Sequence, residues 1–179
     1  MTTPCADPSP IAIVDAHYRG ASAACACAVA GTWATAEPCE ERVAMIPAVR
    51  PYRPGAFFER ELPCILEVLA LVRTPFLAVV VDGYVDLDER GTPGLGAHVH
   101  THFAGAVAVV GVAKTAYGRG AFAVPVVRGS SRRPLFVTAR GIPVAHAAEL
   151  VLGMHGAHRT PTLLARVDRL AREALESGA

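Results

Sequence analysis

Two aspartates follow apolar runs of the kind that form buried strands. Asp15 follows residues 11–14 and Asp82 follows residues 76–81, so each carboxylate is expected at the end of its strand. Taken singly, an aspartate in this position is more often a turn or capping residue than a ligand. Because an unpaired carboxylate is costly to desolvate, two of them at neighbouring strand ends favour a hard divalent cation such as Mg²⁺, which carboxylate oxygens bind.

A single lysine stands out among the basic residues. The chain has 17 lysine and arginine residues, and Lys114 is the only lysine. It comes directly after another apolar run, at residues 107–112. An ammonium group is a compact point charge suited to a phosphate or an attacking water, a role that the broad guanidinium fork fills poorly.

The elements that must position these residues combine strands and helices. Buried strands are expected at residues 11–15, 21–30, 43–46, 76–81 and 107–112, with a hairpin formed by residues 122–127 and 135–138. Helices are expected between Gly55 and Pro75 and over residues 144–154 and 163–175. A loop is expected from Gly83 to about Gly96. This order predicts an α/β fold, a mixed sheet with helices on its faces, in which ligands collect at the carboxyl ends of strands.

The composition narrows the possible classes of protein. A chain of 179 residues is expected to form one domain over 1–179, with flexible ends at about 1–10 and 176–179. Hydrophobic residues make up 52% and charged residues 18%, which excludes a disordered chain. The net charge of +1 excludes a nucleic-acid binder that depends on bulk positive charge.

The cysteines and the apolar segments indicate an intracellular protein. Five cysteines without a Cys-x-x-Cys pair are expected to be reduced, mostly core thiols. The N-terminus shows no signal peptide, and no apolar run approaches the ~20 residues of a membrane helix. We therefore expect a soluble, cytoplasmic monomer that makes no membrane contact.

Three alternating histidines leave a second metal site open as an alternative. His98, His100 and His102 would share one face if their segment were a strand, which would suit zinc. No fourth ligand stands at a spacing typical of zinc sites, so this interpretation is the weaker one.

Five segments together resemble the endonuclease V family, deoxyinosine-directed nucleases of the ribonuclease H-like fold, over about residues 12–170. They are the Asp-x-x-Tyr segment 13–18, the Pro-Tyr-x-Pro-Gly and Arg-Glu-x-Pro segments 51–63, the Asp-Gly pair at 82–83, the Gly-Val-Ala-Lys segment ending at Lys114, and the C-terminal segment 159–170. The resemblance implies a ribonuclease H-like mixed sheet with helices on both faces.

The resemblance also implies roles for individual residues. The metal ligands would be Asp15, Asp82 and Glu61, and the catalytic groups would be Asp15, Glu61, Asp82, Lys114 and Asp168. Tyr52 would be the wedge beside the lesion, and the residues around the substrate would be Tyr52, Pro51, Pro54, Gly55, Gly83 and His98. Asp168 is also explained as an ordinary solvated residue beside Arg169.

Some residues depart from the family pattern. Val85 stands at a family glycine, and Asp88 stands where the family has a histidine near the metal. The segment that contains His98 is displaced by one residue, and Glu59 replaces a phenylalanine. These changes affect base recognition and leave the four residues Asp15, Glu61, Asp82 and Lys114 in place.

The expected function is therefore an endonuclease that uses Mg²⁺, with Mn²⁺ as a substitute, to recognise deoxyinosine in DNA. It would hydrolyse a phosphodiester on the 3′ side of the lesion and so initiate repair. Two alternatives stay open. One is a nucleic-acid-binding relative with weak or altered catalysis, and the other is a nuclease with a different lesion preference or with a preference for inosine in RNA.

Overall fold

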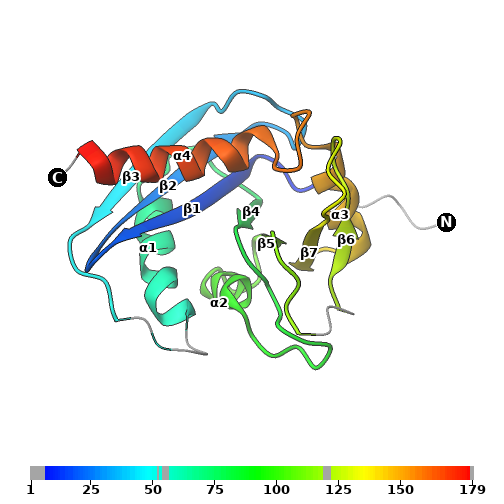
Figure 1. Ribbon diagram of the computed structural model, residues 1–179, viewed down its shortest axis with the longest axis horizontal. Coiled ribbons are helices and arrows are strands. Elements are labelled where there is room, and N and C mark those ends of the chain that lie inside the picture. Colours follow the sequence, from blue (N-terminus) through cyan, green and yellow to red (C-terminus); the bar gives the residue numbers. More distant parts are fainter. Residues whose placement is uncertain (1–6, 52, 54–56, 119–121, 178–179) are drawn as a thin grey trace.

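The computed structural model describes residues 7–51, 53, 57–118 and 122–177. Within them the chain forms a seven-stranded sheet in the order β3-β2-β1-β4-β5-β7-β6 (Figure 1). The strands are β1 (Ile11–Arg19), β2 (Ser22–Ala30), β3 (Glu40–Ile46), β4 (Ala78–Val81), β5 (Ala108–Ala113), β6 (Val124–Val126) and β7 (Leu135–Arg140). The neighbours β1, β4 and β5 are parallel, and the other pairs are antiparallel. The mixed sheet predicted from the sequence is confirmed.

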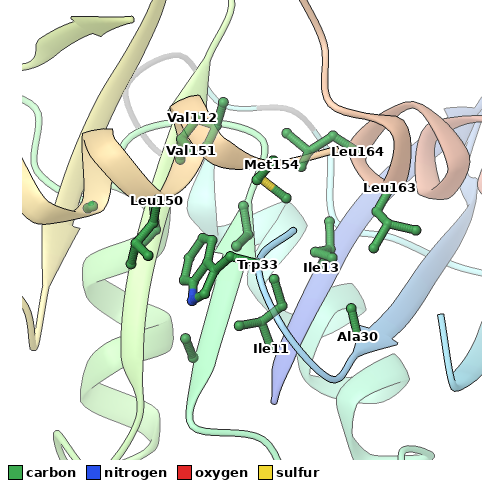
Figure 2. Packing of buried hydrophobic residues seen from close by; sticks show 14 of the residues in the cluster. Ile11, Ile13, Ala30, Trp33, Val112, Leu150, Val151, Met154, Leu163 and Leu164 are labelled. Atoms are coloured by element: carbon green, nitrogen blue, oxygen red, sulfur yellow. The ribbon is translucent and has the colours of Figure 1, made fainter. Parts of the chain in front are cut away.

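Helices cover both faces of this sheet. They are α1 (Phe58–Ala70), α2 (Leu95–His102), α3 (Val144–Gly153) and α4 (Thr162–Ser177). One hydrophobic core joins the sheet to α3 and α4 and encloses Trp33, as Figure 2 shows. A second core joins the other face to α1 and α2. Within the described ranges, no helix combines the length and apolar character needed to span a membrane.

The strand β1 is longer than the sequence predicts. We expect it to end at Asp15, but it continues to Arg19 because its antiparallel partner β2 pairs with all nine residues, down to Arg19 opposite Ser22. The parallel partner β4 stops earlier, where Val14 lies opposite Val81. Asp15 therefore marks the end of the parallel pairing and not the end of the strand.

The histidine segment is a helix and not a strand. His98, His100 and His102 all lie in α2, where successive residues turn by about 100°. The three imidazoles therefore do not share one face, and the zinc hypothesis that depended on a strand is wrong. Within the ranges that the structure describes, no group of three histidine, cysteine, aspartate or glutamate side chains is arranged to hold a metal ion.

Candidate active site

Asp15 and Asp82 lie next to each other across the parallel strands. Since Val14 is paired with Val81, the residue that follows on each strand carries its carboxylate to the same edge of the sheet. Asp15 accepts a hydrogen bond from the main-chain N–H of Ala16 at 2.8 Å. Burial, followed by the negative charge of Asp82, raises the pKa of Asp15 to about 7. The predicted pair of carboxylates is thus present where the parallel pairing of β1 and β4 ends, although Asp15 lies within β1 and not at its end.

Glu61 adds a third carboxylate from α1, which packs against β1 and β2. It lies in the first turn of the helix and is only 4% exposed. Its Oε2 atom is buried and has no hydrogen-bond partner in the described chain. Burial raises the pKa of Glu61 to about 8, and the charges of Asp15 and Asp82 add to the effect. The negative charges of Asp15 and Asp82 thus repel that of Glu61.

Lys114 follows β5 and brings the positive charge of the site. Its Nζ atom lies 2.5 Å from Oδ2 of Asp82. Burial alone would lower the pKa of Lys114, but the bond to Asp82 and the charge of Asp15 outweigh burial and raise it. The ammonium group is therefore held in its charged form beside the carboxylates.

Asp168 approaches the site from α4, on the α4 face of the sheet. Its carboxylate is paired with Arg172, four residues later on the same helix. Its charge also reaches Asp15, whose pKa it raises slightly, and Lys114. The structure thus brings together all five of the residues predicted to be catalytic, with Asp168 at the margin.

The chemistry of these side chains fits a hard divalent cation. Carboxylate oxygens are the preferred ligands of Mg²⁺, and a cation would compensate both the mutual repulsion and the unpartnered Oε2 of Glu61. The described carboxylates are not arranged as a finished set of ligands, since Asp82 is bonded to Lys114. Asp15 and Glu61 remain available to a metal.

Two glycines allow the chain to turn sharply behind Asp82. Gly83 has a φ of +145°, a conformation that residues with a Cβ rarely adopt. Gly111 in β5 lies directly against this turn, and a Cβ there would be 2.5 Å from the carbonyl oxygen of Gly83 and 2.7 Å from Oγ1 of Thr138. The Gly-Val-Ala-Lys segment thus needs its glycine so that the loop after Asp82 can cross β5.

A largely apolar pocket of about 290 Å³ opens beside Asp82. Its lining residues are Phe57, Phe58, Asp82, Gly83, Tyr84, Leu87, Pro93, Gly94, Leu95 and Tyr117. His98, predicted to contact the substrate, stacks on Phe58 with ring centroids 3.8 Å apart and so supports the wall of the pocket. Gly83, also predicted to contact the substrate, is one of the lining residues. Pro51 is exposed, and the predicted residues Tyr52, Pro54 and Gly55 lie outside the described residues.

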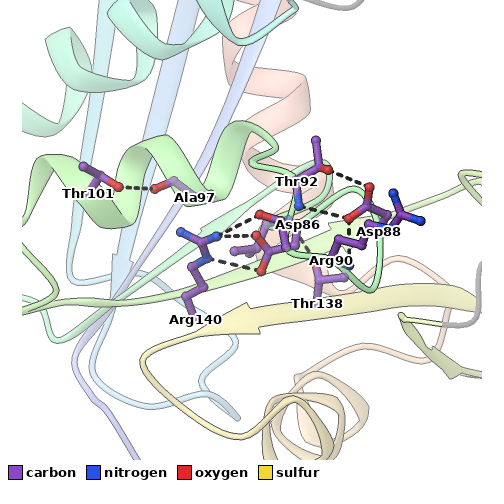
Figure 3. Close-up of polar contacts among 10 residues, drawn as sticks. Asp86, Asp88, Arg90, Thr92, Ala97, Thr101, Thr138 and Arg140 are labelled. Carbon is purple, nitrogen blue, oxygen red and sulfur yellow. Dashed lines mark hydrogen bonds and ion pairs between the residues drawn. The ribbon is translucent and has the colours of Figure 1, made fainter.

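The loop that departs from the family pattern is held by its own contacts (Figure 3). Asp86 forms a two-bond ion pair with Arg140 of β7, at 2.6 and 3.2 Å. Asp88 accepts hydrogen bonds from the hydroxyl and the N–H of Thr92 and from the N–H of Arg90. The hydrogen bonds from Thr92 lower the pKa of Asp88. Asp88 therefore stabilises the turn of this loop.

Two arginines that sequence reasoning gave no role hold the neighbourhood of Lys114. Arg159 donates hydrogen bonds to the carbonyl oxygens of Lys114 and Pro134. Arg128 is 4% exposed and donates to five carbonyl oxygens. They belong to Leu152 in the last turn of α3 and, between α3 and α4, to Met154, Gly156, His158 and Arg159. The contacts join residues 24 to 45 positions apart in the chain, so local sequence patterns carry no signal for them.

Comparison with known sequences gives a family for the chain. Residues 3–150 match the family model of endonuclease V. An endonuclease V of Nocardia farcinica is 33% identical over 187 aligned residues, which cover 93% of this chain and 81% of that protein. An endonuclease V of Xanthomonas oryzae is 36% identical over 101 residues, which cover 56% of this chain and 40% of that protein.

Comparison with solved structures agrees with the family found from the sequence comparisons. The endonuclease V of Streptomyces avermitilis superposes with a TM-score of 0.77 at 26% identity, over 94% of this chain and 82% of the other. The endonuclease V of Ciona intestinalis, solved with a DNA that contains an inosine followed by a ribo-adenosine, has a TM-score of 0.78 at 15% identity, over 94% and 86% of the two chains. The expected ribonuclease H-like fold is confirmed. The chain belongs to the endonuclease V family, a family of nucleases that are generally metal dependent and act on phosphodiester bonds.

Proposed function

We propose that this protein is a Mg²⁺-dependent endonuclease that recognises deoxyinosine in DNA and hydrolyses a phosphodiester on its 3′ side. One observation carries the proposal: the partly buried carboxylate of Asp15 and the buried carboxylate of Glu61 lie beside Asp82, which also lines the aromatic pocket. A phosphodiester held at the carboxylates would thus place a neighbouring base within reach of the pocket. Enzymes that act at a damaged base commonly extrude it into such a pocket.

The residues of the site have different roles in hydrolysis. Asp15, Asp82 and Glu61 would hold Mg²⁺, with Mn²⁺ as a substitute, and the bound ion would supply Lewis-acid charge at the scissile phosphate. Glu61, through its unpartnered Oε2, accepts a proton from the attacking water as the water oxygen bonds to phosphorus. The bond from phosphorus to the leaving 3′ oxygen breaks, and that oxygen takes up a proton from solvent water to become a hydroxyl. Lys114 places a positive charge beside the pentacovalent phosphorane. Asp168 orients the water from the side of α4.

The pocket favours recognition of the base mainly by shape and stacking. Among its described lining residues, only Asp82, Tyr84 and Tyr117 have polar side-chain atoms. The hydroxyl of Tyr84 is already engaged, since it donates to the carbonyl oxygen of Thr115 and accepts from the N–H of Tyr117. This observation favours a second candidate function, a nuclease of the same site with a broader lesion preference.

A cleavage assay tests these candidates. The protein is incubated with matched oligonucleotides that contain inosine, uracil, an abasic site, a mismatch or no lesion, as DNA and as RNA, with Mg²⁺ or with EDTA. We expect a nick on the 3′ side of inosine that requires Mg²⁺ and that the Asp15→Asn and Glu61→Gln variants lose. Equal cleavage of the other lesions or of RNA would establish the broader nuclease. Binding without any metal-dependent nick would refute catalysis and leave the nucleic-acid-binding relative.

A further inference from the structure

The strand β1 continues past the carboxylate site and carries further polar side chains with it. Side chains two residues apart lie on the same face of a strand, so Asp15, His17 and Arg19 all face α4. At about 3.3 Å per residue, His17 lies roughly 7 Å and Arg19 roughly 13 Å beyond Asp15 along the strand. A row of one carboxylate, one imidazole and one guanidinium thus leads away from the site.

The end of α4 closes this row into a hollow of about 160 Å³. The hollow is lined by His17, Tyr18, Arg19, Arg172, Leu175 and Glu176. Figure 1 shows α4 running along β1 and β2 towards the outer end of their hairpin. Arg172 links the hollow to the active site, because its guanidinium is bonded to Asp168, whose charge reaches Asp15.

Around the hollow, one positively charged side chain has no ion-pair partner among the described residues. Arg19 is exposed and, within the described chain, takes part in no ion pair or side-chain hydrogen bond, and the same holds for His17. Arg172 shares its charge with Asp168, and Glu176 places an exposed carboxylate at the rim. Arg19 is therefore the group that is free to bind an anion, with Arg172 and the imidazole beside it and Glu176 opposing it.

We propose that His17, Arg19 and Arg172 form a subsite for a phosphodiester of the substrate strand, one or two nucleotides from the bond that is cut. Phosphate contacts of this kind fix the register of a protein on nucleic acid and carry no sequence information. The subsite would hold the backbone of the substrate nucleic acid next to β1. At the same time, the base beside the cleaved bond would be held in the pocket next to Asp82. This inference rests on the proposed function, because it supposes that the scissile phosphate lies at Asp15.

The variants Arg19→Gln and His17→Ala test the subsite, with Arg73→Gln as the matched control. Arg73 is also exposed but follows α1 at the opposite end of the parallel strands. For Arg19→Gln we expect a five- to tenfold rise in KM for an inosine oligonucleotide with kcat nearly unchanged, as for a contact kept throughout the reaction. In Arg19→Gln, the slope of log KM against the logarithm of the salt concentration should fall by about 1. Glu176→Gln should lower KM, since it removes a repelling charge.

Replacing single phosphates identifies the partner atom. A methylphosphonate at one or two positions beside the cut should weaken the wild type and leave Arg19→Gln unaffected. If wild type nicks inosine DNA but Arg19→Gln behaves like Arg73→Gln, the subsite is refuted while the proposed function stands. If wild type binds an oligonucleotide but does not cut it, the proposed function fails, and the salt slope of the dissociation constant still decides the subsite. If wild type binds no oligonucleotide, both are wrong.

Discussion

Arg159 donates a hydrogen bond from its guanidinium to the main-chain carbonyl of Lys114, and a second one, at 2.7 Å, to the carbonyl of Pro134. The loop that carries Arg159 is itself held by the buried guanidinium of Arg128. The far end of the chain thus fixes the backbone from which the Lys114 ammonium reaches Asp82. The position of this charge depends on tertiary contacts as well as on the strand β5.

Replacing Arg159 should slow cleavage without removing any group that touches the substrate. In Arg159→Lys, one ammonium cannot reproduce two directed bonds from a planar guanidinium, so Lys114 loses part of its support. We expect kcat to fall on the order of 10-fold with KM little changed, because misplacing a catalytic group is costly. Single-turnover kinetics measure this loss, and Arg169→Lys, on the exposed side of α4, is the control. A rise in KM alone, at constant kcat, would contradict a positioning role.

Lys114→Arg should lose cleavage while the fold stays intact. The guanidinium is larger than the ammonium and spreads its charge over a plane, so it cannot place a compact positive charge where Nζ of Lys114 lies beside Asp82. We expect a loss of at least about 100-fold in kcat and an unchanged far-ultraviolet circular dichroism spectrum. If the variant cuts as well as wild type, the single lysine of this chain is a compositional accident.

The three carboxylates should make the metal-free protein less stable as the pH rises. Unfolded aspartate and glutamate lose their protons near pH 4, whereas the raised pKa values of Asp15 and Glu61, about 7 and 8, keep protons on the folded state. Between about pH 4 and pH 8 the folded state therefore binds more protons, and stability falls as the pH rises through this window. We expect Tm in EDTA to drop on the order of 5 °C between pH 6 and pH 8.5.

Two controls isolate this effect. Asp15→Asn removes one of the repelling charges, so it should flatten the pH dependence and raise Tm at pH 8.5 in EDTA while abolishing cleavage. Glu40 has the opposite shift, since hydrogen bonds from Thr74 and Arg73 lower its pKa to about 2, so it contributes nothing to a change above pH 6.

Added Mg²⁺ should stabilise wild type more at pH 8.5 than at pH 6, because the ion competes with protons for the carboxylates. Equal stabilisation by Mg²⁺ at both pH values would contradict binding of the ion at these carboxylates.

The sequence was sufficient for the elements whose apolar residues repeat clearly. The run before Asp82 and the run before Lys114 predict β4 and β5 within two residues, and the parallel register then places Asp15 beside Asp82. The extension of β1 to Arg19 was not predictable from its own residues, since 16–19 are mostly polar. Pairing with β2 decides it.

The helix α2 shows why alternation can mislead. The alternating histidines of residues 98–102 imitate a strand, but the buried residues Leu95, Gly96 and Val99 follow the helical spacing of three and four. Gly96 also packs so closely on Val85 that a Cβ would lie 2.7 Å from its side chain. Tertiary packing of this kind, like the bond from Arg159 to Lys114, leaves no pattern along the chain.

The ion pair between Asp86 and Arg140 should couple the altered loop to the sheet, and a double-mutant cycle measures that coupling. Both side chains are partly buried and share two bonds, a geometry in which an ion pair contributes about 1 kcal/mol. Asp86→Asn and Arg140→Gln should each lower the free energy of unfolding in urea, and the double variant should lose about 1 kcal/mol less than the sum of the two. The exposed Arg133→Gln serves as the control for loss of one positive charge.

The same two variants decide whether this loop sets the choice of base. The loop contributes Leu87 and Pro93 to the pocket beside Asp82, so loosening its attachment to β7 should widen the range of bases that fit. We expect the ratio of kcat/KM for inosine over uracil to fall by about 5-fold in Arg140→Gln, and the rate on inosine itself to change less. An unchanged ratio in a variant whose stability has fallen as predicted would show that the ion pair supports the fold alone and that the base is selected elsewhere in the pocket.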